Sequence, residues 1–386
     1  MTSSVTTKPV KKIAVIIPKY GLVGGAEGFA AELTERIALN NRFEMHVLAN
    51  RWSSRSDRII FHKIPIIRFP KFLTTISFAY FVRQKLSCLD MDLIHAHDRI
   101  FHADLFTMHG IPHRIWVKQI RQKRWLSLFD RGTAWVEGRL IQDRSCRCIL
   151  PVSALTRDAL LEEYPALDPA RIQVMHPGVD MAEYLNLDRR QCREEIRRLY
   201  GIGESDFLIL FVSMNFDVKG LDQLVAALAK LKGNLPAKRT RLLVVGKGDQ
   251  QRYRKYARDL GVEDSLAFAG VVRRDLLTRI YMAADLYAML SQFDTFGMVV
   301  LEAMAASLPV IISAHVGAKD LVREGVNGYT IQDPADIDGI AGRIMQLQYD
   351  ETRHALGQAA HETARNHSWD AAAKQMEAIY EKAFPA

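Results

Sequence analysis

Short apolar runs rich in β-branched residues alternate with helix-forming stretches along this chain, and the alternation occurs as two separate series. The first series opens with KIAVIIP at 12–18 and the second with FLILFV at 207–212. Continuous runs of this kind are typical of strands buried on both faces of a parallel sheet. Strand, turn and helix in repeated succession indicate a doubly wound α/β sheet. We therefore expect two Rossmann-like, doubly wound domains that face each other across a cleft.

The length of 386 residues also favours two domains, because one hydrophobic core rarely serves so long a chain. The segment 186–205 is charge-dense and poor in apolar residues, so we expect it to join the domains. The first domain is then 1–190 and the second 200–365. Further strands are expected at 44–48, 93–96, 105–108, 147–152 and 172–175 in the first domain, and at 241–245, 266–269, 285–289 and 309–312 in the second.

Composition places the chain among ordinary globular enzymes, with 48% apolar and 25% charged residues. The apolar run at 13–17 is too short for a signal peptide or a membrane span. Four cysteines are too few for a disulfide framework in so long a chain, which favours a cytoplasmic protein with reduced thiols. The histidines at 95, 97, 102 and 113 lack convincing i, i+4 spacing, so we expect no metal site.

Positive charge is concentrated in the first half of the chain. Residues 1–200 contain 31 lysines and arginines against 21 acidic residues, whereas the whole chain has a net charge of +8. The stretch 111–147 holds nine basic and three acidic residues together with Trp116, Trp125, Phe129 and Trp135. Basic residues beside interfacial aromatics suit an anionic membrane surface or an acidic acceptor. The alternative is a solvated helix face whose tryptophans point into the core. Nucleic acid is not an expected partner, because the excess is local and no nucleic-acid motif accompanies it.

The segment FDTFGMVVLEAM at 293–304 is the strongest indication of a binding site. Gly297 stands where a loop turns into a helix, so free N–H groups at the helix start suit a diphosphate. Glu302, in the first turns, can accept hydrogen bonds from ribose hydroxyls, and Asp294 can accept them from a sugar on the other side of the diphosphate. This pattern indicates a nucleotide-sugar site. The alternative is that Asp294 caps the helix and Glu302 is a surface charge.

The same segment resembles the E-x7-E signature of the retaining glycosyltransferases of family 4, which have the GT-B fold, with aspartate in the first place. The family includes enzymes like the glucosyltransferase that builds the inner core of lipopolysaccharide, and the resemblance extends along most of the chain. Further matches in the family's order are MHG at 108–110, HPGVD at 176–180, VKGL at 218–221 and SLPV at 307–310. The last segment, about 368–386, resembles the closing helix that packs back onto the first domain.

The resemblance implies a role for each matching residue. It implies that His109, Lys219 and Asp294 act in catalysis, with Lys219 stabilising charge on the departing diphosphate. Taken alone, a lysine or histidine after a strand is more often solvated or structural, and a Gly-Gly turn is more often a plain tight turn. Most family members have an arginine where this chain has Met214, so another group must support the diphosphate. The implied donor-binding set is Gly24, Gly25, Lys219, Lys247, Val271, Asp294, Thr295, Phe296, Gly297, Met298, Val299 and Glu302.

The function that follows is retaining transfer of a hexose from UDP-glucose to a lipopolysaccharide-core or similar lipid-linked glycan. UDP-galactose, UDP-N-acetylglucosamine and GDP-mannose are the other donors considered. The resemblance implies a mechanism that does not depend on a metal ion, so we expect no metal or other cofactor. The first domain is expected to bind the acceptor and the second the donor, on the inner face of the cytoplasmic membrane. Two other interpretations stay open: a nucleotide-sugar epimerase of the same fold, and a non-catalytic nucleotide-sugar sensor.

Overall fold

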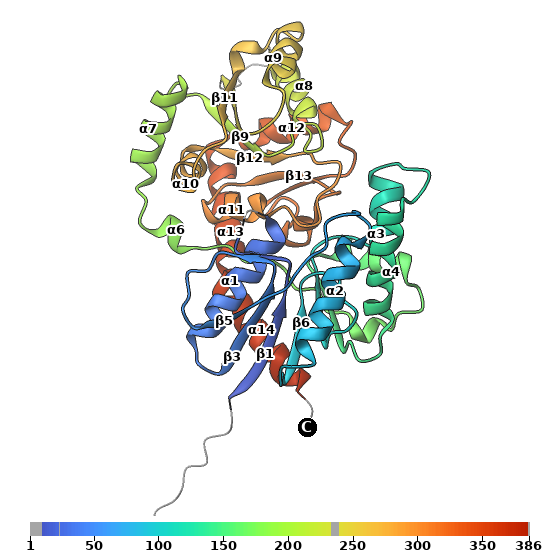
Figure 1. Cartoon of the computed structure of the whole chain (residues 1–386). Helices are drawn as coiled ribbons and strands as arrows, with labels where there is room; N and C mark the ends of the chain where they lie inside the picture. The colour runs from blue at the N-terminus through green and yellow to red at the C-terminus, as the bar shows by residue number, and fades with distance from the viewer. Residues whose placement is uncertain (1–9, 23, 233–238, 385–386) are drawn as a thin grey trace, which may run out of the picture. The chain divides into compact units, whose positions relative to one another are not determined.

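The computed structural model describes residues 10–22, 24–232 and 239–384. The chain divides into two compact units, one formed by Met1–Pro177 with Trp369–Ala386 and the other by Gly178–Ser368. Each unit is a mixed α/β structure built around its own parallel sheet (Figure 1).

The sheet of the first unit has six parallel strands in the order β5-β3-β1-β6-β7-β8. This is the strand order of the doubly wound dinucleotide-binding fold, and its direction reverses between β1 and β6. A short parallel pair, β2 and β4, lies apart from it. The strands are β1 (Lys11–Ile16), β2 (Lys19–Tyr20), β3 (Phe43–Ala49), β4 (Arg51–Trp52), β5 (Ile59–Lys63), β6 (Leu93–Ala96), β7 (Leu105–Met108) and β8 (Cys148–Pro151).

Helices cover both faces of this sheet. Successive residues of a strand point to opposite faces, and in β6 Ala96 packs in the cluster formed with α2 and α4, whereas His95 hydrogen-bonds Tyr380 of α14. Helix α1 packs on α14 through the rings of Phe29 and Trp369. The helices are α1 (Gly25–Leu39), α2 (Leu73–Leu86), α3 (His113–Ile115), the π-helix η1 (Trp116–Ile120), α4 (Leu128–Gln142), α5 (Ala154–Glu163), the 3-10 helix η2 (Pro169–Arg171) and α14 (Trp369–Ala383).

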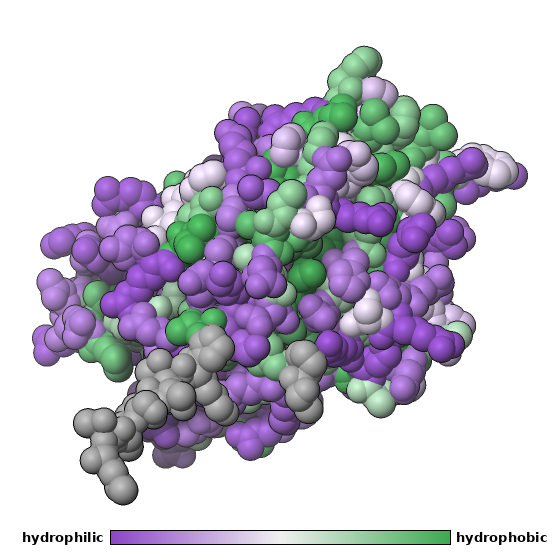
Figure 2. Space-filling view, turned by 60° about the horizontal axis from the view of Figure 1, so that its bottom comes forward, coloured by the Kyte–Doolittle hydropathy of each residue, from purple (hydrophilic) through white to green (hydrophobic). Residues whose placement is uncertain are grey.

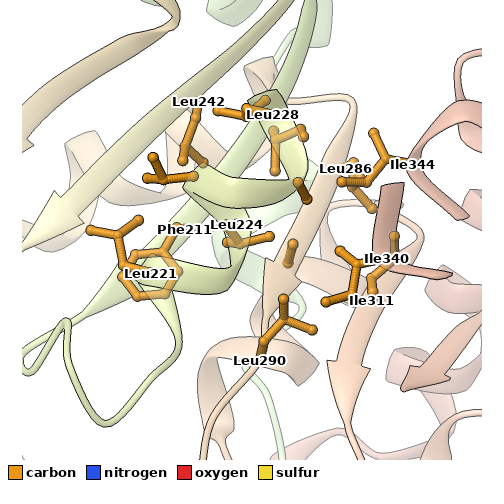
Figure 3. Packing of buried hydrophobic residues seen from close by; sticks show 14 of the residues in the cluster. Phe211, Leu221, Leu224, Leu228, Leu242, Leu286, Leu290, Ile311, Ile340 and Ile344 are labelled. Atoms are coloured by element: carbon orange, nitrogen blue, oxygen red, sulfur yellow. The ribbon is translucent and has the colours of Figure 1, made fainter. Parts of the chain in front are cut away.

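The second unit repeats the same strand order, β11-β10-β9-β12-β13-β14, and reverses between β9 and β12. Figure 3 shows part of its core, in which Phe211 and Leu242 of the sheet meet Leu224 of α8. The strands are β9 (Phe207–Ser213), β10 (Thr240–Gly246), β11 (Leu266–Gly270), β12 (Leu286–Met289), β13 (Val310–Ser313) and β14 (Gly328–Ile331). The helices are α6 (Ala182–Leu185), α7 (Arg189–Tyr200), α8 (Leu221–Leu231), α9 (Gln250–Asp259), η3 (Glu263–Ser265), α10 (Arg274–Ala283), α11 (Met298–Ala305), η4 (Gly317–Leu321), α12 (Ile337–Leu347) and α13 (Asp350–Asn366).

The segment expected to join the domains is a helix of the second unit, so that prediction was wrong. Helix α7 is capped by the side chain of Asp188 and ends at Gly201 in the left-handed conformation. Two of its apolar residues, Cys192 and Ile196, are spaced by four and both are buried, whereas Leu199 is exposed. The abundant charges had obscured this narrow apolar stripe.

The strand expected at 172–175 is also absent, although the chain does extend along β8. The amides of Gln173 and Met175 donate to the carbonyls of Ile149 and Pro151, at 3.0 and 2.9 Å. Pro151 has no N–H to donate back, so the ladder stays one-sided and only an isolated bridge forms. The edge strands β5 and β14 were not predicted from the sequence.

The loop between β9 and α8 depends on a glycine. Gly220 has a φ of +79°, and a Cβ on it would lie 2.2 Å from the carbonyl oxygen of Leu290. We expect Gly220→Ala to destabilise the second unit by at least about 1 kcal/mol, because strain and a backbone clash add together. The matched control is Gly342→Ala inside α12, where a Cβ meets open space and should stabilise by up to about 1 kcal/mol. Thermal unfolding of both variants checks this, and equal melting temperatures would contradict it.

Candidate functional site

Two loops meet at the carboxyl edge of the second sheet, one after β9 and one after β12. They bring the Nζ of Lys219 to 2.5 Å from Oδ2 of Asp294, and each side chain is 21% exposed. Lys219 also donates to the carbonyl of Phe293 at 3.1 Å, and Asp294 Oδ1 accepts the amide of Phe296 at 3.2 Å. The pair therefore lies where the direction of the sheet reverses, which is where doubly wound sheets bind their ligands.

Helix α11 begins beside this pair. Its N-cap is Gly297, with a φ of +86° and no side-chain capping hydrogen bond. A Cβ there would come within 2.9 Å of Val316 and 3.0 Å of Met289, so only glycine suits the position. Met298 and Val299 form the first turn, whose amide end carries positive partial charge. Asp294 is not the cap of this helix, which excludes that alternative.

Glu302 is buried, with 8% of its surface exposed, so it is not a surface charge. Its Oε1 accepts from Arg274 Nη1 at 2.5 Å and its Oε2 from the Tyr281 hydroxyl at 3.0 Å. Arg274 also pairs with Glu183 at 2.8 Å. Burial lowers the pKa of Arg274, but the two carboxylates outweigh it and the pKa is raised.

Arg274 and Tyr281 were not predicted as site residues. A signal was available, because Arg274 opens helix α10. A cation at the positive end of a helix is unfavourable unless an acidic partner compensates. The segment 293–304 offers one such partner in Glu302.

Lys247 and Val271 follow β10 and β11, so they lie at the same edge of the sheet as Lys219 and Asp294. Both are exposed, as is Met214 after β9. The backbone of Lys247 is held by a 3.0 Å hydrogen bond from its amide to the carbonyl of Ser213. This hydrogen bond holds Lys247 beside Met214, the position at which most family members have an arginine.

The first unit has a pocket of about 320 Å³ at its own switch point. The chain segments after β1, β6 and β7 line it with Pro18, His97 and His109 respectively. From α1, Glu27 contributes to the lining, one turn beyond the predicted Gly24 and Gly25. Gly24 is the N-cap of α1 with a φ of +152°, and Glu27 Oε2 occupies the place of a Cβ there.

Three histidines lie in a row at this pocket: the rings of His97 and His109 are stacked, and His95 is tilted against His97 behind them. The rings of His95 and His97 are 4.2 Å apart and those of His97 and His109 are 5.3 Å apart. His97 Nδ1 hydrogen-bonds His109 Nε2 at 3.0 Å, while His95 is bonded to Tyr380 and Thr107, each at 2.8 Å. Burial lowers the pKa of His95 and of His109 to about 3, and it lowers the pKa of His97 as well. The array is therefore neutral at physiological pH.

Within the described part of the chain, no group of three or more His, Cys, Asp or Glu side chains is placed to hold a metal ion. In the same residues, no helix is both long and apolar enough to cross a membrane.

Two family models match the chain in succession. Residues 23–183 match the model described as Glycosyltransferase Family 4, and residues 192–363 match Glycosyl transferases group 1. An uncharacterized glycosyltransferase of Methanocaldococcus jannaschii is 26% identical over 96% of this chain and 97% of its own length. The D-inositol 3-phosphate glycosyltransferase of Corynebacterium efficiens is 34% identical, but the match covers 58% of this chain and only 54% of that protein.

Solved structures share the fold over nearly the whole length. WaaG, a glycosyltransferase involved in lipopolysaccharide biosynthesis, superposes with a TM-score of 0.77 at 21% identity, covering 95% of this chain and 99% of WaaG. Anabaena HepE in complex with UDP-glucose gives 0.69 at 17% identity, covering 96% and 99%. The two family models and the duplicated doubly wound sheet place this chain among the GT-B glycosyltransferases of family 4.

Proposed function

We propose that the chain transfers a hexose, with retention and without a metal, from UDP-glucose to a lipopolysaccharide-core or similar lipid-linked glycan. The observation that carries the proposal is the Lys219–Asp294 pair beside the start of α11. A partly buried cation and a helix amide end are the two groups that hold a diphosphate when no divalent ion is present. The UDP-glucose bound to HepE and the lipopolysaccharide role of WaaG support the choice of donor and acceptor.

The ion pair indicates how the site changes when donor binds. Without donor, Asp294 neutralises Lys219. A diphosphate carries more negative charge than one carboxylate, so it draws Lys219 away and releases Asp294 to accept hydrogen bonds from sugar hydroxyls. As the bond to the sugar breaks, negative charge grows on the diphosphate, and Lys219 stabilises the leaving group.

Glu302 holds the nucleoside end of the donor in this proposal. Arg274 and Tyr281 fix its carboxylate, and each oxygen retains a lone pair for a ribose hydroxyl. A carboxylate already held in place loses little conformational entropy when the ligand binds.

His109 acts as a neutral hydrogen-bonding group. Its Nε2 is engaged by His97, and no described residue is hydrogen-bonded to its Nδ1. A neutral imidazole at the pocket can hydrogen-bond a sugar hydroxyl without competing for the proton that the leaving phosphate takes up.

The stretch 111–147 is the proposed membrane contact. Trp125 and Trp135 are 74% and 48% exposed, so these tryptophans do not point into the core. Lys118, Arg121, Lys123 and Arg124 are exposed and form no ion pair with a described residue. Figure 2 shows that hydrophobic residues lie in separate patches among hydrophilic ones on one face of the molecule. Charge attraction with aromatic insertion therefore supports peripheral binding at the inner face of the cytoplasmic membrane.

The deciding experiment incubates the purified chain with UDP-glucose and an extracted core acceptor in EDTA, and proton NMR reads the anomeric configuration of the product. D-inositol 3-phosphate is tested in parallel, because the C. efficiens relative is named for that acceptor. Conversion of the donor without any acceptor would instead show an epimerase, and transfer that requires a metal or inverts the anomer would overturn the proposal.

If Lys219 exchanges Asp294 for the donor diphosphate, variants of Lys219 and of Asp294 should have different effects on UDP binding. Lys219→Ala should weaken UDP binding by about 10- to 100-fold, because it removes hydrogen bonds to a charged ligand. Asp294→Asn should lower kcat by about 100-fold without weakening UDP binding, since Lys219 then has no competing carboxylate. Calorimetry with UDP and steady-state kinetics check both effects. Lys230→Ala, at an exposed surface pair with Asp338, is the control. If Asp294→Asn weakened UDP binding as much as Lys219→Ala, the exchange would be wrong.

The neutral histidines predict a dependence of stability on acid. Each of these histidines has a lowered pKa in the folded state. Below about pH 6.5 the unfolded chain therefore binds more protons than the folded chain does. The stability that the neutral histidines contribute is fully present above about pH 6.5, and it is lost as the pH falls toward their pKa in the folded state. Unfolding free energy should fall by about 1.4 kcal/mol per pH unit for each histidine between pH 6 and 4. His97→Asn, which cannot titrate, should reduce that slope by about one histidine's share; an unchanged slope would show that His97 is already protonated in the fold.

Membrane binding should depend on charge. The triple variant Arg121→Gln, Lys123→Gln, Arg124→Gln should bind vesicles of phosphatidylglycerol about 100-fold more weakly, at roughly 1 kcal/mol per basic residue. The wild type should lose affinity as salt rises, because the Debye length shortens. Vesicle sedimentation measures both, with Arg190→Gln on α7 as the control. Binding that ignores salt would refute the electrostatic part.

A further inference from the structure

Helices α2 and α4 lie side by side on one face of the first sheet and are in contact through their first halves (Figure 1). Thr75 and Thr133 hydrogen-bond each other at 3.2 Å. Gly132 permits this approach, because a Cβ on it would lie 3.2 Å from Ile76 Cδ1 and 3.3 Å from the carbonyl of Phe72. A separate pocket of about 410 Å³ lies between the second halves of the same helices.

The floor of this pocket is apolar, and cations stand at its rim. Arg83 of α2 and Arg139 of α4 are both exposed. The size falls within the range of pockets that bind small organic ligands. The apolar lining consists of Ala79, Val82, Leu86, Ile94, Ile100 and Phe101.

The two arginines at the rim have no acidic partner among the described residues, whereas the one carboxylate in the lining, that of Asp143, is hydrogen-bonded. Neither Arg83 nor Arg139 forms an ion pair with a described residue, and the Arg139 guanidinium lies 5.7 Å from the ring centre of Trp135. Asp143, also in the lining, is held by His102 Nδ1 at 3.0 Å and by the amide of Ser145 at 3.0 Å. Arginines in the last turns also offset the negative ends of the two helices. That role accounts for the charges but leaves the apolar hollow between them without a function.

We propose that this pocket binds a single acyl chain carrying an anionic head group. The chain lies on the apolar floor and the head group is held between Arg83 and Arg139. Each buried methylene raises affinity by about fourfold, so a long chain outweighs the head group in the binding energy. The pocket adjoins the stretch 111–147 through Trp135 and Arg139 of α4, so a membrane at that stretch would bring lipid to it.

Calorimetry with the full chain and 1-oleoyl lysophosphatidic acid below its micelle concentration tests the proposal. We expect one saturable site whose affinity falls at least tenfold in the double variant Arg83→Gln, Arg139→Gln. Leu86→Trp, which places a larger ring among the apolar lining residues, should abolish binding. Arg131→Gln is the control, because Arg131 is exposed on α4 but does not line the pocket. Thermal melting establishes that each variant is folded.

The outcomes separate this site from the membrane surface and from the proposed transfer reaction, since no activity is measured. If millimolar inorganic phosphate displaced the lipid, the site would bind an anion alone and not an acyl chain, and the proposal would be overturned. Equal loss of affinity in Arg131→Gln would mean diffuse surface charge, and would also overturn it. An octanoyl analogue that binds at least tenfold more weakly than the oleoyl probe supports it, and equal affinity of the two counts against it.

Discussion

The reversal of strand order in each sheet is the constraint on which both candidate sites depend. From β9 the chain winds toward β10 and β11, and from β12 it winds the other way toward β13 and β14. The chain therefore continues in opposite directions along the sheet after β9 and after β12, which leaves the carboxyl ends of these two strands accessible. Lys219 and Asp294 occupy those two loops. In the first unit the same reversal of strand order occurs between β1 and β6, where the pocket lined by His97 and His109 lies.

Partial burial then determines the chemistry of both sites. Lys219 and Asp294 are close enough to neutralise each other, so the site tolerates two charges that are partly removed from bulk water. The histidines at the other switch point have no acidic partner in their array, and burial keeps them neutral. The candidate site of the second unit thus contains an ion pair, whereas that of the first unit contains uncharged hydrogen-bonding groups.

The sequence indicated elements where local pattern and tertiary environment agree. Central strands such as β1 and β9 are buried on both faces, so their apolar runs are unbroken and were predicted. The edge strand β5 has exposed and half-buried residues, which removes that signal. Helix α7 was taken for a linker because its apolar stripe is only one residue wide per turn. At 172–175 the sequence favoured a strand, and the missing N–H of Pro151 on the neighbouring strand prevented the ladder.

By itself, the sequence determined which residue types occupy the candidate site: Lys219, Asp294, Gly297 and Glu302 could be identified because each lies within a short local motif. Only the tertiary structure decided their partners. Arg274 reaches Glu302 from 28 residues away, and Tyr380 reaches His95 from 285 residues away. Hydrogen bonds and ion pairs act over a few ångströms of space and leave no trace in local periodicity. The protonation and orientation of the site residues therefore follow from the folded chain, whereas their identity and spacing belong to the sequence.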